Sequence, residues 1–223
     1  MTYLISTLIF AVVGTAQLNI FEIEGIFSNA HINALEGHIE EYEYTDDDLL
    51  ILQYSSQEGS AESIEELNSL LSGYDFPIGV WFGPYKISID FKQLNNFDYI
   101  GFSPGLEINN VSFDESVEKK YCTINICNLE ERKIFVSSNE GIYDNYLIVG
   151  TLGSFIENID FVVSDQSIEF FKPSLFERFY IAISNPIFTY MFFVLGFALI
   201  GLELFAIGPG LMAVVGSLLV ISS

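Results

Sequence analysis

Residues 49–82, LLILQYSSQEGSAESIEELNSLLSGYDFPIGVWF, contain the pattern that decides the fold. The apolar run Leu49–Tyr54 is typical of a strand that is covered on both faces. Helical spacing follows over Ser60–Leu71, with acids near the N-terminal end, where the helix dipole favours them. Ile78–Phe82 is a second apolar run, and a Gly-Pro pair ends it. The stretch therefore predicts a strand–helix–strand unit.

The same alternation continues on both sides of this unit. Before it, Leu18–Ile23 is a β-prone run and Asn29–Tyr42 has helical spacing. After it, Tyr99–Phe102 is a further strand that ends in Ser-Pro-Gly; the pattern then weakens, with Tyr146–Val149 as one more candidate strand. Strands that alternate with helices pair in parallel through right-handed crossovers. We therefore predict an α/β fold with a parallel βαβ sheet over residues 17–165.

The C-terminal region predicts a membrane segment over residues 186–223. Ile187–Phe205 contains one charged residue, Glu203, and at about 1.5 Å per residue it approaches the roughly 30 Å thickness of a bilayer core. A buried core helix seldom needs so many apolar residues in succession. The second apolar run, Leu211–Ile221, follows a Gly-Pro-Gly break and is too short to span alone, so it predicts a re-entrant piece or the start of a second membrane helix.

The N-terminus has the pattern of a secretory signal. Leu4–Val13 is a short apolar run followed by a small-x-Ala sequence, so we expect residues 1–16 to be a signal peptide. A short membrane anchor and a buried first strand also fit this run. A signal places the α/β domain outside the cytoplasm, at the cell membrane. Residues 166–185, rich in aromatics, then form a juxtamembrane linker.

Composition excludes several classes of function. Eight basic residues face 30 acidic ones, a formal charge of −22 that opposes binding to nucleic acid. An acidic cluster within residues 36–48 lacks the spacing of a calcium loop, and the two histidines lie far from the two cysteines, so we expect no metal and no cofactor. Cys122 and Cys127 form a disulfide if the chain turns near Asn125, and are otherwise two free thiols; both alternatives fit the spacing.

The order of these segments resembles the NfeD family of membrane-bound serine proteases of the ClpP class. The resemblance is strongest in the membrane region and moderate in the soluble part. The matching segments are Asn185-Pro186, Gly201–Gly210, Ile20–Gly25, Ser56–Ser63 and Ser103–Gly105. It implies a ClpP/crotonase-like domain followed by transmembrane helices. It also implies peptide substrates, a stomatin- or prohibitin-type membrane partner, work in membrane-protein quality control and assembly as a homo-oligomer.

The family's spacing also implies candidate site residues. Counting back from the Ser-Pro-Gly sequence, Ser88 falls on the nucleophile and Asp98 on the usual acid. Gly59 would be the surviving part of the turn whose N–H groups stabilise the oxyanion. A lysine kept neutral by burial would be the base, and Lys120 or its neighbour Lys119 is nearest in sequence.

Several positions depart from the family pattern. Ser88 has Lys86, Ile87, Ile89 and Asp90 as neighbours where the family has small residues, and Gln57-Glu58 replaces the Pro-Gly of the oxyanion turn. Losing one oxyanion donor costs about 2.7–4 kcal/mol of transition-state stabilisation. The segment that carries the family's base lysine is also short. We therefore predict a pseudoenzyme, whose degenerate site binds a partner or peptide without cleaving it.

Two alternatives to the pseudoenzyme stay open at this stage. One is an active serine endopeptidase that cleaves hydrophobic segments through Ser88 and a lysine. The other is an assembly domain with no ancestral site. The acid Glu203 is expected to pack beside the Pro-Gly turn or to lie at the membrane interface.

Overall fold

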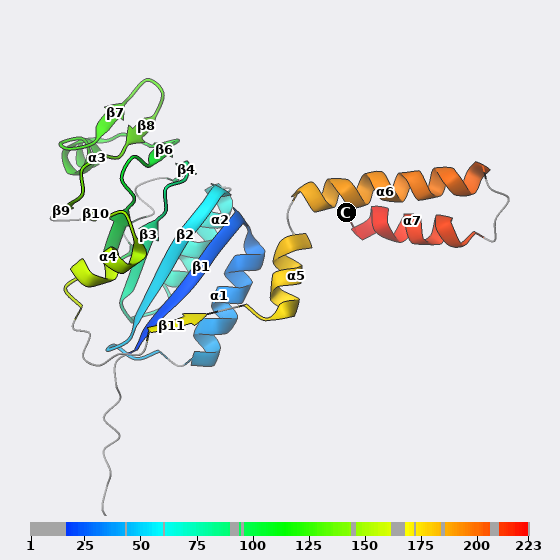
Figure 1. Cartoon of the computed structure of the whole chain (residues 1–223), viewed down its shortest axis with the longest axis horizontal. Coiled ribbons are helices and arrows are strands. Elements are labelled where there is room, and N and C mark those ends of the chain that lie inside the picture. The colour runs from blue at the N-terminus through cyan, green and yellow to red at the C-terminus, as the bar shows by residue number, and fades with distance from the viewer. Residues whose placement is uncertain are drawn as a thin grey trace, which may run out of the picture.

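The computed structural model describes residues 17–42, 44–59, 61–89, 94, 96–143, 146–161, 168–171, 173–183, 186–205 and 210–222. The expected signal peptide, residues 1–16, lies outside these ranges. Within them the chain forms two sheets, a set of covering helices and a C-terminal helical hairpin (Figure 1).

Seven strands form the main sheet. They are β1 (Leu18–Phe27), β2 (Leu49–Gly59), β3 (Ile78–Phe82), β5 (Tyr99–Phe102), β9 (Gly141–Tyr143), β10 (Tyr146–Ile148) and β11 (Ile168–Phe171). Their order is β11-β1-β2-β3-β5-β10-β9, and every pairing is parallel except that of β9 with β10. The predicted parallel sheet is confirmed.

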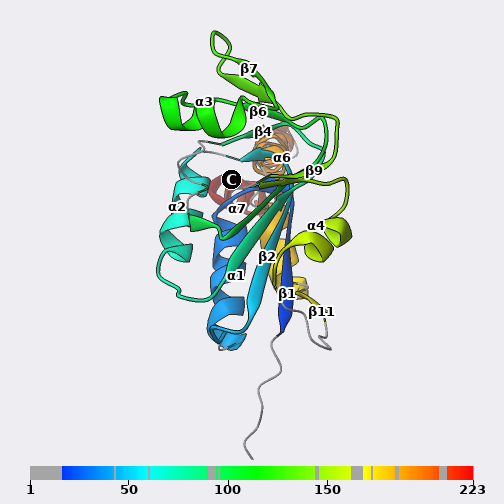
Figure 2. The same cartoon turned by 90° about the vertical axis from the view of Figure 1, so that its left-hand side faces the viewer.

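Helices cover both faces of this sheet, which explains the continuous apolar runs in the sequence. The helices α1 (Asn29–Tyr42) and α2 (Ala61–Leu71) pack on one face, and α4 (Leu152–Asn158) packs on the other (Figure 2). The four residues Leu49–Leu52 of β2 are fully buried because alternate side chains meet opposite layers.

A bulge between β1 and β2 extends both strands beyond their predicted ends. Gly25 has φ +77°, and the pairing register shifts after it. The buried hydroxyl of Ser56 donates to the Gly25 carbonyl at 2.6 Å and accepts from the Phe27 amide at 3.2 Å. The segment that was expected to turn from Ser56 onward is therefore strand as far as Gly59.

A second, smaller sheet follows the carboxyl ends of β3 and β5. It contains β4 (Ile87–Ser88), β6 (Glu107–Asn109), β8 (Lys133–Phe135) and β7 (Ile126–Asn128), in that order. The helix α3 (Glu115–Tyr121) lies at the same end of the molecule (Figure 1). This subdomain has strands of two or three residues that carry no periodic signal, and the sequence did not predict it.

Two elements occupy the expected linker, residues 166–185. The strand β11 pairs in parallel with β1, so the main sheet is completed after residue 165. The helix α5 (Leu175–Ile183) then lies against α1 and leads to the membrane region (Figure 1).

The C-terminal hairpin consists of α6 (Pro186–Phe205) and α7 (Leu211–Ser222). Among the described helices, the one over Ile187–Phe205 is long and apolar enough to cross a membrane, and it is almost entirely exposed. Glycines form the contact between α6 and α7, because a Cβ on Gly196 would lie 2.7 Å from the Gly216 carbonyl oxygen. Close approach through small residues is a common way for membrane helices to pack.

Candidate functional site

Ser88, the candidate nucleophile, lies on a strand of the small sheet. It is half-buried, pairs with Asn109 of β6, and sits between the buried residues Ile87 and Ile89. Its hydroxyl oxygen accepts a hydrogen bond of 2.6 Å from the side-chain amide of Asn110. The structure places Ser88 in β4, and residues 90–93, directly after this strand, lie outside the described ranges.

The lysines on the small sheet are paired with acids. Lys86 contacts Glu107 at 2.7 Å, and Lys133 contacts both Glu107 at 3.5 Å and Glu131 at 3.3 Å. The hydrogen bond from Lys86 lowers the pKa of the Glu107 carboxyl, and the carboxylate of Glu131 raises the pKa of Lys133. These carboxylates stabilise the charged lysine, whereas a general base must be neutral. Lys86 and Lys133 are therefore surface ion-pair residues.

The candidate base lysines line a separate cavity beside α3. Lys119 and Lys120 lie in the last turn of that helix, and burial lowers the pKa of Lys120. The Lys120 ammonium lies 5.1 Å from the centroid of the Tyr121 ring. The cavity has a volume of about 530 Å³, and its lining is Ser116, Lys119, Lys120, Thr123, Ile124, Ile142, Tyr143 and Tyr146. Ser88 is not among these lining residues, and no hydrogen bond given for the described residues joins its hydroxyl to Lys119 or Lys120.

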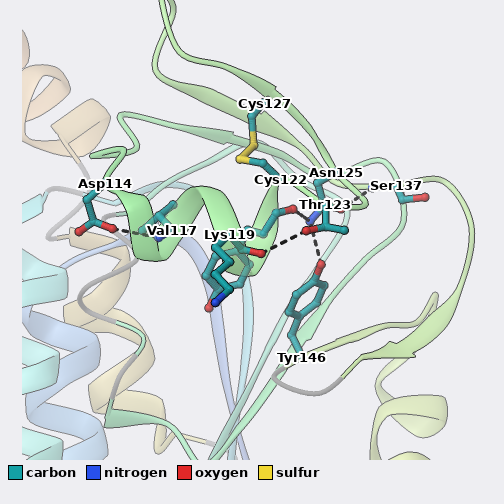
Figure 3. Close-up of a disulfide and its surroundings, with 10 residues drawn as sticks. Asp114, Val117, Lys119, Cys122, Thr123, Asn125, Cys127, Ser137 and Tyr146 are labelled. Atoms are coloured by element: carbon teal, nitrogen blue, oxygen red, sulfur yellow. Dashed lines mark hydrogen bonds between the residues drawn. A yellow bond between two sulfur atoms is a disulfide. The ribbon is translucent and has the colours of Figure 1, made fainter.

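Asn125 holds the walls of this cavity in place (Figure 3). Its side-chain amide donates to the Tyr121 carbonyl at 2.9 Å and contacts the Tyr146 hydroxyl at 3.2 Å. Its side-chain oxygen accepts from the Ser137 amide at 2.9 Å. Three separate chain segments therefore meet at one buried side chain.

A disulfide closes the chain around this point. Cys122 and Cys127 are bonded, with their Cα atoms 5.6 Å apart (Figure 3). This decides between the two alternatives that the spacing left open, and Asn125 lies in the turn that such a bond requires. The bond fixes the end of α3 relative to β7.

The sequence did not identify the sheet side of the cavity. Ile142, Tyr143 and Tyr146 come from β9 and β10, which no local pattern connects to α3. The helix side had a readable signal, because Ser116 lies three and four residues before Lys119 and Lys120 and so shares their helix face. Burial raises the pKa of the Tyr146 hydroxyl, which keeps this wall neutral.

The other two residues implied by the resemblance lie at opposite ends of the main sheet, and β2, which ends at Gly59, contacts the strand β4 that carries Ser88. Gly59 is the last residue of β2, where it pairs with Phe27. Asp98 precedes β5, and its carboxylate accepts from the Ile78 amide at 2.9 Å while its own amide donates to the Ile78 carbonyl at 2.8 Å. That bond joins the amino ends of two parallel strands, whereas Ser88 follows a carboxyl end.

Glu203 connects the two helices of the hairpin. Its carboxylate accepts from the backbone amide of Gly210 at 2.6 Å. Gly210 has φ +81°, and its carbonyl accepts from Val214 in the first turn of α7. A carboxylate at a helix N-terminus is stabilised by the unpaired amides and the dipole there.

The comparisons with known proteins identify the architecture. No family model matches the sequence, and no curated protein matches it either. Solved structures do match. One is a lysine-to-alanine mutant of the 1510-N membrane-bound stomatin-specific protease, in complex with a substrate peptide: the TM-score is 0.53 at 8% identity, covering 77% of this chain and 99% of that chain.

A second match is the 1510-N membrane protease specific for a stomatin homolog from Pyrococcus horikoshii. Its TM-score is 0.52 at 9% identity, covering 76% of this chain and 99% of that chain. The chain has the fold of a membrane-bound protease. At these identities the likeness establishes the fold, and it confirms the predicted ClpP-like α/β architecture.

Proposed function

We propose that this chain is a membrane-anchored, protease-like protein that binds peptide segments without cleaving them. One observation carries the proposal: the candidate nucleophile is bonded to an amide donor, and the candidate base lysines line a different cavity. On this view the protein is a pseudoenzyme that serves membrane-protein quality control as a binding partner.

The geometry around Ser88 argues against catalysis. A general base must lie within about 2.6–3.2 Å of the proton that it removes. Among the described residues, the side-chain hydrogen bond of the Ser88 hydroxyl is to Asn110, whose amide donates and cannot accept a proton. Lys86, two residues before Ser88, is paired with Glu107. Within the part of the chain that the structure describes, the Ser88 hydroxyl therefore has no hydrogen bond to a general base.

The cavity beside α3 supports peptide binding. It adjoins β9, the last strand in the described sheet order, and an extended peptide can add to such an edge. Ile142 of β9 is 67% exposed, and the two lysines of α3 provide positive charge for a carboxylate. A structure of the same fold holds a substrate peptide, and its protein is stomatin-specific. We therefore propose an extended peptide of a stomatin-like membrane protein as the ligand.

The disulfide and the apolar helix support a location at the cell membrane with the α/β domain outside the cytoplasm. Disulfides persist in oxidising compartments and are rare in the cytosol. Both cysteines lie in the α/β domain, so this domain is the part we place outside. Assembly as a homo-oligomer is part of the same proposal.

Labelling with a fluorophosphonate tests the absence of catalysis. The full chain in detergent micelles, with Ser88→Ala and Ser116→Ala as matched variants, is expected to show no stoichiometric labelling. Labelling that disappears in Ser88→Ala would establish the alternative, an active serine endopeptidase, and labelling that disappears in Ser116→Ala would place a reactive serine on α3. Either result overturns the proposal.

Peptide binding is tested separately. Overlapping fluorescent peptides from a stomatin-like protein of the same genome are titrated with the full chain. Lys120→Ala should weaken binding at least fivefold, about 1 kcal/mol. Lys86→Ala removes an equal charge from a residue outside the cavity and should leave binding unchanged. Equal affinities for the two variants, or binding to no peptide, would contradict the proposed site.

A further inference from the structure

The helix α5 has a well-defined beginning. Ser174 and Glu177 form a reciprocal cap: the Ser174 amide donates to the Glu177 carboxylate at 2.6 Å, and the Glu177 amide donates to the Ser174 hydroxyl at 3.3 Å. Such a cap stabilises the first turn of a helix. This segment is therefore a helix by its own local signals, and it directly precedes the membrane region.

One face of α5 belongs to the α/β domain. Arg178, Ile181 and Ala182 line a cavity of about 490 Å³ whose other walls include Glu24 of β1 and His31 of α1. The spacing of these three residues places them on one side of the helix. This side, the seated face, is the one that α5 turns toward the domain, although Arg178 and Ala182 are still exposed.

The other face of α5 is apolar and exposed. Leu175, Phe176, Phe179 and Tyr180 are 81%, 87%, 66% and 57% exposed. Their spacing of one, four and five residues forms a single stripe along the helix. Three aromatic side chains and a leucine at such exposure form an interaction surface.

The orientation of α5 suits a bilayer surface. The helix lies on the side of the domain from which α6 leaves, and it runs across the axis of α6 (Figure 1). When α6 crosses a bilayer, α5 lies along the surface of that bilayer, with its seated face toward the domain and its exposed stripe toward lipid. Only two residues separate Ile183, the end of α5, from Pro186, the start of α6.

We propose that α5 is an interfacial helix whose stripe of Leu175, Phe176, Phe179 and Tyr180 inserts below the lipid headgroups. It forms a second membrane contact that fixes the orientation of the domain. Aromatic side chains concentrate at this depth, and amphipathic helices bury their apolar face there. The chain's formal charge of −22 opposes attraction to anionic lipid, so apolar insertion drives the contact. Continuity with α6 makes lipid, not another protein, the occupant of the stripe.

Tryptophan scanning tests this contact in the full chain. Phe176→Trp and Phe179→Trp variants are reconstituted into phosphatidylcholine vesicles, with and without brominated acyl chains. The matched control is Phe135→Trp, at an exposed aromatic position of β8 on the far side of the domain from α6. The natural tryptophan, Trp81, is buried and gives a constant background.

The expected result is a blue-shifted emission in both α5 variants, with more than half of the added fluorescence quenched by the brominated lipid. The control should show no added quenching. Emission from positions 176 and 179 that matches the control, in wavelength and in quenching, would overturn the proposal and leave the stripe as a surface for a protein partner. This outcome is independent of the peptide-binding test, which concerns the opposite end of the sheet.

Discussion

Replacing Asn125 by leucine tests whether one buried side chain holds the candidate binding cavity together. Leucine has a similar size but can make none of the amide's hydrogen bonds. Tyr146, 3% exposed, then has a hydroxyl without its partner, and the half-buried amide of Ser137 loses its acceptor. The Tyr121 carbonyl keeps a bond from the backbone amide of residue 125. A buried polar group without a partner costs about 1–3 kcal/mol, so the free energy of unfolding should fall by about 2–4 kcal/mol.

The assay is urea denaturation of the full chain in detergent micelles, followed by the fluorescence of Trp81. The indole of Trp81 donates to the Val149 carbonyl, directly after β10, so the probe reports on the sheet beside the cavity. The control is Asn128→Leu, which removes one turn hydrogen bond that the Glu131 amide donates to the Asn128 side-chain oxygen, and it should cost less than about 1 kcal/mol.

A double-mutant cycle separates the hydrogen bond from other effects. Tyr146→Phe removes the hydroxyl itself, so the leucine substitution at Asn125 should cost about 1 kcal/mol less in that background. If Asn125→Leu and Asn128→Leu lower the free energy of unfolding equally, or if the cycle shows no coupling, the hydrogen bonds of the Asn125 side chain do not determine the stability of this region.

Three further predictions concern other parts of the molecule. Gly101→Ala should lower the free energy of unfolding by about 1–3 kcal/mol, because the added Cβ would lie 2.5 Å from a ring carbon of Phe155 in α4. Gly79→Ala, on the neighbouring strand β3, should be nearly neutral in the same urea assay, because the nearest atom to its added Cβ lies 3.4 Å away. Equal costs for the two variants would refute the packing argument. Burial lowers the pKa of His31, so the unfolded state takes up a proton on this side chain at a higher pH than the folded state does. The stability that neutral His31 contributes should be complete above about pH 7 and should fall as pH drops below 6.5. His31→Gln should reduce this loss of stability, and an unchanged pH dependence in that variant would contradict the prediction. Gly196→Ala should lower the midpoint temperature of thermal unfolding of the hairpin in micelles, because the added methyl would lie 2.7 Å from the backbone of α7. Gly201→Ala should leave this temperature unchanged, because no atom lies within 4 Å of its added methyl. Two equal midpoints would show that the glycine contact is absent.

The sequence predicts the elements whose signals are local. The bounds of α1 and β3 agree with the prediction because apolar periodicity and Gly-Pro stops define them. The end of β2 was missed because Ser56 bonds to Gly25, 31 residues away. The strand β11 was missed for the same kind of reason, since its partner is the first strand of the domain.

The candidate site was harder to predict than the fold. Family spacing assigns Ser88 from its distance in sequence to a Ser-Pro-Gly turn, but sequence distance does not report which side chains meet. The position of Lys120 depends on the chain's path after β5, where short strands and a disulfide replace periodic elements. The exposed stripe of α5, by contrast, is visible in the sequence as two apolar pairs, at residues 175–176 and 179–180, on either side of one charged pair.

The pairing of β11 with β1 determines when the domain can finish folding during synthesis. β1, the first strand in the described part of the chain, has one edge open until residues 168–171 emerge, and an open strand edge is a template for aggregation. Those residues come just before α5 and α6, so the edge is sealed as the anchor enters the bilayer. A nascent chain released before residue 168 would therefore lack the anchor of α6 and expose a strand edge that promotes aggregation. Membrane attachment through α6 and protection of the β1 edge thus occur together, late in synthesis.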